Sequence, residues 1–405
     1  MSFEQGLSGL NAASRNLDVI GNNVANASTV GFKSADAIFA DVYANSLQAA
    51  SSVGAGIGTS VVAVQQQFVQ GTISTTSNPL DVAINGNGFF RMDTAGDITY
   101  SRNGQFHLDK DGFIVNATGA RVTGYGVDAS GQLVASAPGP LQVSASQLQA
   151  NATTDASIGL NLDATKPVVT GTFDPTDATT YTSSTSMAVY DSLGNSHTLA
   201  TYYAKTGPNA WAVYGTFDGT ALPASLGTLT FKTDGTLDTT ATTLPFNVST
   251  AVTTGATTPF AFTLDYGNAT QFGSSFSVDT LSQDGYTAGL LSGYSIADDG
   301  TIAGQYSNGQ TRTLGQIALA RFTNLNGLQP IGNNMWRESS ESGQPIIGEP
   351  GSSNFGVVQS GAVEESNVDL TNQLVEMITA QRVYQANAQT IKTEDQMMNT
   401  LVNLR

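Results

Sequence analysis

Three short stretches contain residue types that could bind a ligand. Gly86-Asn-Gly88-Phe-Phe-Arg91 begins like a dinucleotide fingerprint, but the last glycine and a following βαβ unit are absent. Residues 108–113 contain two aspartates and a glycine, fewer ligands than a calcium loop requires. Gly54-Ala-Gly56-Ile-Gly58 lacks the Lys-Ser/Thr pair of a phosphate-binding loop. We therefore interpret these stretches as a hairpin or bulge, a turn between strands, and a flexible loop.

The two histidines of the chain, His107 and His197, are the other candidates for chemistry. Neither lies near a nucleophile elbow or a glycine-framed serine, so we interpret both as ordinary surface or strand residues. The chain has no cysteine, which excludes disulfides, thiolate metal sites and a cysteine nucleophile. The sequence therefore predicts no enzyme activity, no metal site and no cofactor.

Charge and hydropathy restrict the partners that the chain could bind. Its 405 residues carry 15 Lys and Arg against 32 Asp and Glu, a formal net charge of -17. Nucleic acid and anionic membranes both require a basic face, so neither is an expected partner. No apolar run approaches the roughly 20 residues that span a bilayer, and the N-terminus lacks the pattern of a cleaved signal peptide. We expect a protein that either stays in the cytoplasm or leaves it through a signal of another kind.

The C-terminal segment 361–405 is predicted to be a long helix. No glycine or proline occurs from residue 362 onward, and apolar residues recur at alternating steps of four and three. Ser366 and Asp369 resemble a helix cap, and Glu364 and Glu365 are placed near the helix start, where its dipole favours acids.

The N-terminal segment, within residues 1–70, shows the same spacing over its first 25 residues. Gly6, Gly9 and Gly21 should each weaken this helix by roughly 1 kcal/mol relative to alanine. We therefore expect the N-terminal helix to be poorly formed alone and ordered by a partner.

The region between these helices is predicted to be β. Asn-Gly and Asp-Gly dipeptides, which favour tight hairpin turns, recur between runs rich in Val, Ile, Thr, Tyr and Phe. Residues 71–145 and 284–360 are predicted to form one β domain. The segment 146–283, rich in Thr and without Glu, is predicted to form a second one inserted into it. The fold class is thus mixed, with a helical coiled-coil region from both chain ends and two mainly-β, sandwich- or barrel-like domains.

The two apolar stripes could close the chain's own core, which is the usual role of an amphipathic helix. The long helix, however, carries more apolar length than one sheet face could cover. We therefore predict that the terminal helices pack on each other and then on neighbouring chains. The residues of this predicted seam are Phe3, Leu7, Leu10, Leu17, Val24, Leu370, Leu374, Met377, Tyr384, Ile391 and Met398.

Four blocks of sequence resemble conserved segments of the bacterial flagellar rod and hook proteins. They are Asn22-Asn-Val-Ala-Asn26-Ala-Ser-Thr-Val-Gly31-Phe32-Lys33, residues 70–90, residues 306–320 and residues 360–391. They occur in the expected order and cover roughly both outer thirds of the chain. The presence of a large Thr-rich insertion makes the chain resemble the hook branch of this family, since the rod members lack one; the inserted sequence itself carries no matching block.

The resemblance implies a subunit that polymerises with its own copies into a short curved tube. In such a tube the terminal helices pack as coiled coils around a central channel, and the assembly transmits torque from rod to filament while bending. Implied partners are the distal rod protein, the hook–filament junction protein, the hook cap scaffold and the flagellar type III export gate. The implied location is extracellular. An export element at Phe39-Ala-Asp-Val-Tyr43 is an alternative to an ordinary strand or helix fragment there.

Two other interpretations remain open at this point. The first is a distal rod protein of the same family, which differs in length and in lacking the insertion. The second is a secreted β-rich adhesin or surface protein that uses its helical ends only to oligomerise.

Overall fold

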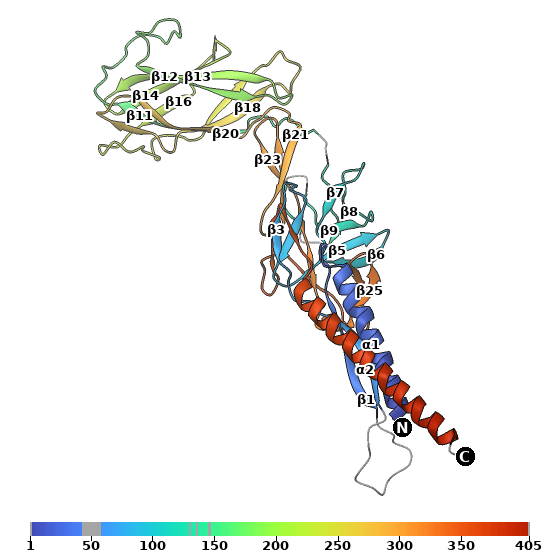
Figure 1. Cartoon of the computed structure of the whole chain (residues 1–405). Coiled ribbons are helices and arrows are strands. Elements are labelled where there is room, and N and C mark those ends of the chain that lie inside the picture. The colour runs from blue at the N-terminus through green and yellow to red at the C-terminus, as the bar shows by residue number, and fades with distance from the viewer. Residues whose placement is uncertain (1, 43–57, 129–130, 135–136, 145–146, 404–405) are drawn as a thin grey trace. The chain divides into compact units, whose positions relative to one another are not determined.

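The computed structural model describes residues 2–42, 58–128, 131–134, 137–144 and 147–403 (Figure 1). They fall into two compact units. Unit 1 lies within residues 1–145, 293–305 and 311–405, and unit 2 within residues 146–292 and 306–310. A helix at each terminus and a mostly-β body confirm those parts of the predicted fold class.

Unit 1 contains both long helices and most of the shorter strands. The first two residues of β21 and the last residue of β22 belong to unit 2. Its elements are α1 (Ser2–Ala25), β1 (Ala35–Val42), β2 (Gly58–Gln66), β3 (Ile73–Thr75), β4 (Val82–Asn85), β5 (Phe89–Thr94), β6 (Asp97–Ser101), β7 (Phe106–Leu108), β8 (Ile114–Asn116), β9 (Arg121–Tyr125), β10 (Gly139–Pro140), β21 (Leu291–Ile296), β22 (Thr301–Tyr306), β23 (Thr311–Ile317), β24 (Leu319–Arg321), the 3-10 helix η1 (Leu325–Gly327), β25 (Gln329–Gly332), β26 (Met335–Arg337), β27 (Ile346–Gly348), β28 (Val357–Ser360), β29 (Ala362–Glu364) and α2 (Leu370–Asn403).

The start of α2 agrees with the predicted cap. The Asp369 carboxylate accepts hydrogen bonds from the backbone N–H groups of Thr371 (2.9 Å) and Asn372 (3.2 Å). These donors have no partner inside the helix, so a side-chain acceptor at this position stabilises its first turn. From Leu370 the helix runs without interruption to Asn403.

The chain returns to its own N-terminal part before α2 begins. Strand β28 pairs antiparallel with β4, and β29 pairs antiparallel with β3. The segments that lead into α2 and away from α1 therefore meet on the same β framework. Beside them lies a core of aromatic rings in edge-to-face contact, formed by Phe89, Tyr100, Phe322 and Trp336.

Unit 2 is built from two five-stranded sheets. Their strands are β11 (Asp155–Asp163), β12 (Ser183–Tyr190), β13 (Ser196–Gly207), β14 (Ala210–Phe217), β15 (Thr220–Ala221), β16 (Gly227–Thr230), β17 (Phe246–Thr250), β18 (Phe260–Asp265), β19 (Thr270–Phe272) and β20 (Ser277–Gln283). One sheet has the order β17-β18-β11-β19, with β20 also on β11. The other has the order β12-β13-β14-β15, with β16 also on β14. Leu160, Tyr203, Trp211, Phe262 and Leu264 are buried in one core that draws on both sheets.

The turn dipeptides fall into two groups. Asp218-Gly219 joins β14 to β15 with positive φ at both residues, 47° and 80°, as a tight hairpin requires. The hairpin interpretation is wrong for Asn103-Gly104. A Cβ atom at Gly104 would lie 1.7 Å from the carbonyl oxygen of Val82, and the Gly104 carbonyl accepts a hydrogen bond from the Val82 N–H. Glycine is needed there for close backbone approach between distant segments.

Candidate assembly surface

Two of the three stretches that could have bound a ligand have structural roles in the part of the chain that is described. In residues 108–113 the Asp109 carboxylate accepts hydrogen bonds from the N–H groups of Asp111 and Phe113, both at 2.8 Å, and so holds the turn between β7 and β8. Residues 86–88 connect β4 to β5. Of the glycine-rich stretch 54–58 only Gly58 is described, and it begins β2. Phe39 lies in β1, whereas Tyr43, the end of the candidate export element, lies outside the described residues.

His197 is a buried residue of unit 2 that lies between two carboxylates. Its Nδ1 atom is 2.7 Å from Asp218 and its Nε2 atom 3.2 Å from Asp191. Burial lowers the pKa of His197, but the two carboxylates outweigh this effect and leave the pKa raised. His107 is exposed in β7. Within the described ranges, no group of three His, Asp or Glu residues could hold a metal ion.

The two terminal helices lie side by side and run antiparallel (Figure 1). Near the start of α1, a Cβ atom built on Gly6 would lie 3.1 Å from Cγ1 of Ile391. Near its end, the Asn23 side chain donates a hydrogen bond of 3.0 Å to the Gln373 side chain. Small residues therefore allow the close approach at one end of the pair, and a buried amide pair joins the helices at the other. Neither helix, over its described residues, is apolar enough over sufficient length to cross a membrane.

The face that α1 turns to its own chain differs from the predicted seam. Ala12, Ala13 and Ile20 are buried on α1, whereas Gln373 and Ala380 are the buried residues on α2. The seam residues are exposed or half-buried. Ile391 is half-buried near Gly6, but the seam as a whole does not close within the chain. The exposed members are Phe3, Leu7, Leu370, Leu374, Tyr384 and Met398, and the half-buried members are Leu10, Leu17, Val24, Met377 and Ile391.

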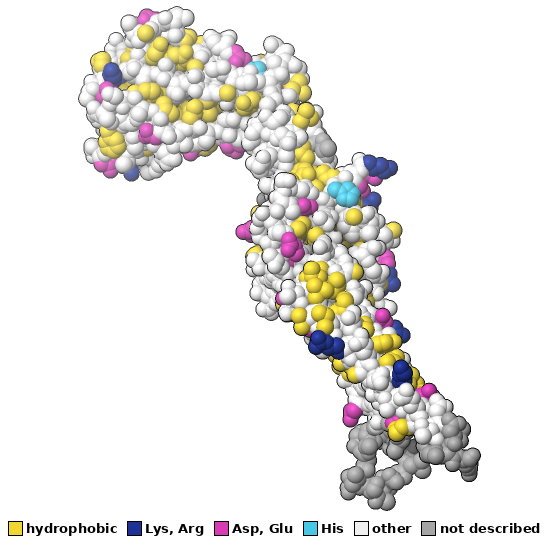
Figure 2. All heavy atoms as spheres, viewed as in Figure 1, with side chains coloured by type: hydrophobic (Ala, Val, Ile, Leu, Met, Phe, Trp, Pro, Cys, Tyr) yellow, Lys and Arg dark blue, Asp and Glu magenta, His cyan; other side chains and the backbone are white. Residues whose placement is uncertain are grey.

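The exposed apolar surface of α2 is wider than the predicted seam. Val375, Ile378, Val383 and Met397 are also exposed, with Val375 reaching 59%. A single heptad stripe does not include them, because they lie on both flanks of the helix. Figure 2 shows apolar side chains in the surface over the two helices, interspersed with charged side chains. We call the exposed apolar side chains of α1 and α2 the helix surface.

A groove of about 600 Å³ lies between α1, β1 and α2. Its apolar lining includes Ala12, Ile20, Phe39, Val375 and Val383. The groove adjoins the helix surface, because Val375 and Val383 belong to both, and polar residues such as Asn16, Asp36 and Glu376 complete its lining. Apolar regions of this kind on soluble proteins mark surfaces that another molecule covers.

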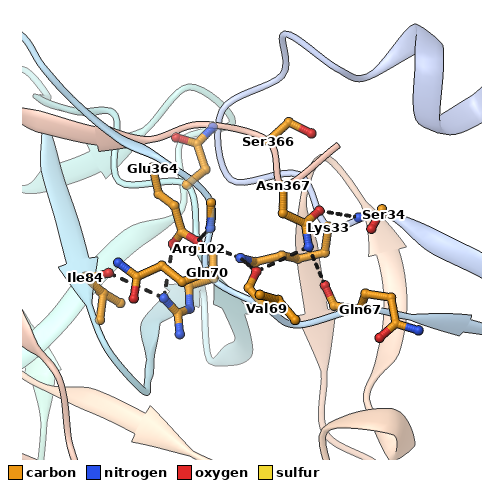
Figure 3. A network of polar contacts seen from close by, with 12 residues as sticks. Lys33, Ser34, Gln67, Val69, Gln70, Ile84, Arg102, Glu364, Ser366 and Asn367 are labelled. Atoms are coloured by element: carbon orange, nitrogen blue, oxygen red, sulfur yellow. Dashed lines mark hydrogen bonds and ion pairs between the residues drawn. The ribbon is translucent and has the colours of Figure 1, made fainter. Parts of the chain in front are cut away.

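A buried ion network lies at the base of the helix pair (Figure 3). The Glu364 carboxylate is 2.6 Å from Lys33 Nζ and 3.0 Å from the guanidinium of Arg102, and the backbone N–H of Gly71 donates to it at 2.9 Å. Lys33 also donates to the carbonyl of Val69 at 2.7 Å. Burial lowers the pKa of Lys33, and the contact with Glu364 opposes this shift.

The network corrects the predicted role of Glu364. The residue is not an acid of the first helical turn, since it ends β29 before α2 begins. Its side chain is fully buried, and its partner Lys33 lies 331 residues away in the sequence. A carboxylate without solvent needs cations and N–H donors, and the β3–β29 pairing places Glu364 among them.

Two asparagines extend the polar contacts from this network toward the helices. Asn367 accepts a hydrogen bond from the N–H of Ser34 (2.7 Å) and donates one to the carbonyl of Gln67 (2.7 Å). Asn23 bonds both the N–H and the carbonyl of Ala35, at 3.0 and 2.8 Å, in addition to its bond with Gln373. Nothing in the local sequence pattern indicates these roles, because each partner comes from a distant segment.

Comparisons with protein families agree along the chain. Residues 3–33 match the family described as flagella basal body rod protein, and residues 83–166 match the flagellar hook protein FlgE/F/G D1 domain. Residues 160–286 match the flagellar basal body protein FlaE D2 domain. Residues 359–404 match the flagellar basal body rod FlgEFG protein C-terminal family.

Full-length relatives give the same result. The flagellar hook protein FlgE of Escherichia coli strain K12 is 44% identical over 412 residues, with 100% of both chains covered. That of Salmonella typhimurium is 45% identical over 415 residues, again with 100% of both covered. A crystal structure of the Helicobacter pylori flagellar hook protein FlgE2 is similar in fold, with a TM-score of 0.56 at 15% identity. The match covers 72% of this chain and 100% of that one.

Proposed function

This chain belongs to the family of flagellar hook proteins, and from that premise we propose that it polymerises into a short curved tube that transmits torque from rod to filament while bending. The family is a structural one and not a family of enzymes. The alternative of a distal rod protein is not favoured, because relatives aligned over the full length at 44% and 45% identity carry the hook name.

The helix surface is the proposed strong joint between copies. The single observation that carries this proposal is that six of the eleven predicted seam residues, among them Leu374 at 45% exposure, are left exposed by their own chain. Burying apolar surface contributes about 25 cal/mol per Å², so packing these faces against neighbouring copies would stabilise a tube strongly. In this arrangement the paired helices pack as coiled coils and line a central export channel.

Unit 2 is the proposed adjustable contact between copies. Its β strands present Thr, Ser and Asp to solvent, as the exposed Thr198, Thr220 and Ser186 illustrate. Polar, hydrated contacts are smaller and easier to re-pair than buried apolar ones. Neighbouring copies could therefore shift relative to each other at unit 2 as the tube rotates, while the contacts between their helices stay unchanged.

The proposed partners follow from this place in a tube. They are further copies of the chain along its length, the distal rod protein at one end, the junction protein at the other, and the hook cap scaffold during growth. The proposed location of the tube is extracellular, and the proposed export route of the chain is the flagellar type III export gate.

An aspartate placed in the helix surface tests the proposal. Leu374→Asp should prevent polymerisation of the purified full-length chain, because a charge would be buried between copies. Ile391→Asp should also prevent it, because its charge would be placed against α1 beside Gly6 and disturb the helix pair. Gln389→Asp is the control, since it adds the same carboxylate to the same helix at a position that is exposed and already polar. Electron microscopy and sedimentation measure the polymer, and near-ultraviolet circular dichroism checks that the β units remain folded. Normal tubes from Leu374→Asp would refute the proposed joint.

A further inference from the structure

The segments that lead out of α1 and into α2 converge on one carboxylate. Lys33 follows α1, Glu364 precedes α2, and the two side chains meet at 2.6 Å. The backbone joins them again, since the Gly31 N–H donates to the Glu364 carbonyl at 2.7 Å. Both helices are therefore fastened at their bases to the same point of unit 1 (Figure 3).

Arg102 connects that point to the β framework. It follows β6, and its guanidinium bonds the Glu364 carboxylate and the carbonyl of Gly86, at 3.0 and 2.8 Å. The guanidinium also lies 5.4 Å from the ring centroid of Phe89 in the aromatic core. Glu364 thus links the helix bases on one side to the framework on the other.

The burial of these charges makes the link stiff. The side chains of Lys33 and Glu364 are 0% exposed, and that of Arg102 is 5% exposed. Separating two buried ions raises the free energy steeply, because water cannot replace the lost partner. A movement of the α1 base relative to β29 would have to separate Lys33 from Glu364 and from the carbonyl of Val69. A movement of the α2 base relative to the framework would have to separate Glu364 from Arg102.

We propose that Lys33, Glu364 and Arg102 are positioning residues that set the angle between the helix pair and the β framework and give this joint its stiffness in the polymer. Two asparagines add hydrogen bonds near the same point: Asn367 accepts one from the N–H of Ser34, and Asn23 donates one to Gln373 in the first turn of α2. The inference rests on the proposed function. It places the network in the part of the subunit through which torque would pass from the helix pair to the β framework.

Lys33→Met is the decisive variant. It removes the tie to the segment after α1 but leaves Arg102 and Glu364 as a balanced ion pair, so the β framework keeps its own contact. Tubes should still form, and their persistence length, measured from electron micrographs, should fall about two-fold or more. Lys110→Met is the control, because Lys110 is exposed in the turn between β7 and β8.

A second pair of variants separates stiffness from folding. Glu364→Gln should soften the tube at least as much as Lys33→Met, whereas Glu365→Gln changes the exposed neighbouring acid and should leave the tube unaltered. Thermal melting of the full-length chain gives the readout of a merely structural role. That role predicts a lower melting temperature for Lys33→Met at unchanged persistence length.

The outcomes are distinct. Unchanged persistence length in Lys33→Met would overturn the inference, and so would a folded Lys33→Met chain that forms no tubes, since Lys33 would then serve assembly and not stiffness. If the unaltered chain formed no tubes, the proposed function itself would fail. Softer tubes from both network variants, with both controls normal, are the expected result.

Discussion

The glycines of α1 allow a sharp test of how the two helices pack. In an isolated helix, Gly9 and Gly21 would weaken the structure equally, but their surroundings differ. A Cβ atom at Gly9 would lie 2.7 Å from Oδ1 and 2.9 Å from Cγ of Asn387 on α2. Among the described residues, and apart from the backbone of α1 itself, no atom lies within 4 Å of a Cβ atom at Gly21. Alanine at these two positions therefore separates helix propensity from helix–helix contact.

The expected magnitudes follow from two opposing effects. Each alanine should gain about 1 kcal/mol of helix stability from the loss of glycine's backbone freedom. At Gly9 the new methyl group must displace the Asn387 amide, the end of a side chain that can rotate, so the cost lies near the lower end of the range of about 1–3 kcal/mol that overpacking takes. Gly21→Ala should therefore stabilise the assembled helices by about 1 kcal/mol, while Gly9→Ala should be neutral or destabilising.

The assay is urea-induced dissociation of the assembled full-length chain, followed by far-ultraviolet circular dichroism and light scattering. The substitution Asn387→Ala supplies the control, because it removes the amide and should restore the benefit of Gly9→Ala in the double variant. Equal stabilisation by Gly9→Ala and Gly21→Ala would refute the close contact between the helices at Gly9.

Two further predictions concern unit 2. The pKa of His197 is raised in the folded chain, so its stabilising contribution is complete below about pH 6.5 and is lost as pH rises through the raised value. The pKa values of Asp191 and Asp218 are lowered, so their contribution is present above about pH 4 and is lost as pH falls through the lowered values. The melting temperature of unit 2, followed by the fluorescence of its one tryptophan, should peak between these limits, and His197→Asn should abolish the alkaline decrease. An alkaline decrease that persisted in this variant would contradict the assignment. Excision of the residues between Leu148 and Gly289, which face each other in a β-bridge, should leave secretion and polymerisation intact but give straight, rigid tubes. Normally curved tubes would exclude unit 2 as the determinant of curvature.

The terminal helices could be predicted because their signals are local. The absence of glycine and proline after residue 361 and the capping side chain of Asp369 both act within a few residues. In the local sequence, Gly9 and Gly21 are equivalent positions of one helix. Only the position of α2 shows that Gly9 serves a contact, whereas Gly21 meets nothing.

The ion network could not be predicted, since its members are distant in sequence. Glu364 stands among other acids near a helix start, a pattern that indicates a solvent-exposed charge favourable to the helix dipole. Its burial follows from strand pairing between β3 and β29, which no local pattern specifies. For a buried ion of this kind, the decisive information is which strands pair.

Measuring how exposed the helix surface is in the assembled polymer tests most directly whether the chain ends bind neighbouring copies. Helical reconstruction of the polymer by electron cryomicroscopy would reveal what covers Val375, Ile378 and Met397, which are 59%, 51% and 52% exposed in the single chain. We expect these side chains to be buried against helices of adjacent copies. A tube in which they remained open to solvent, with copies joined only through their β strands, would contradict the account.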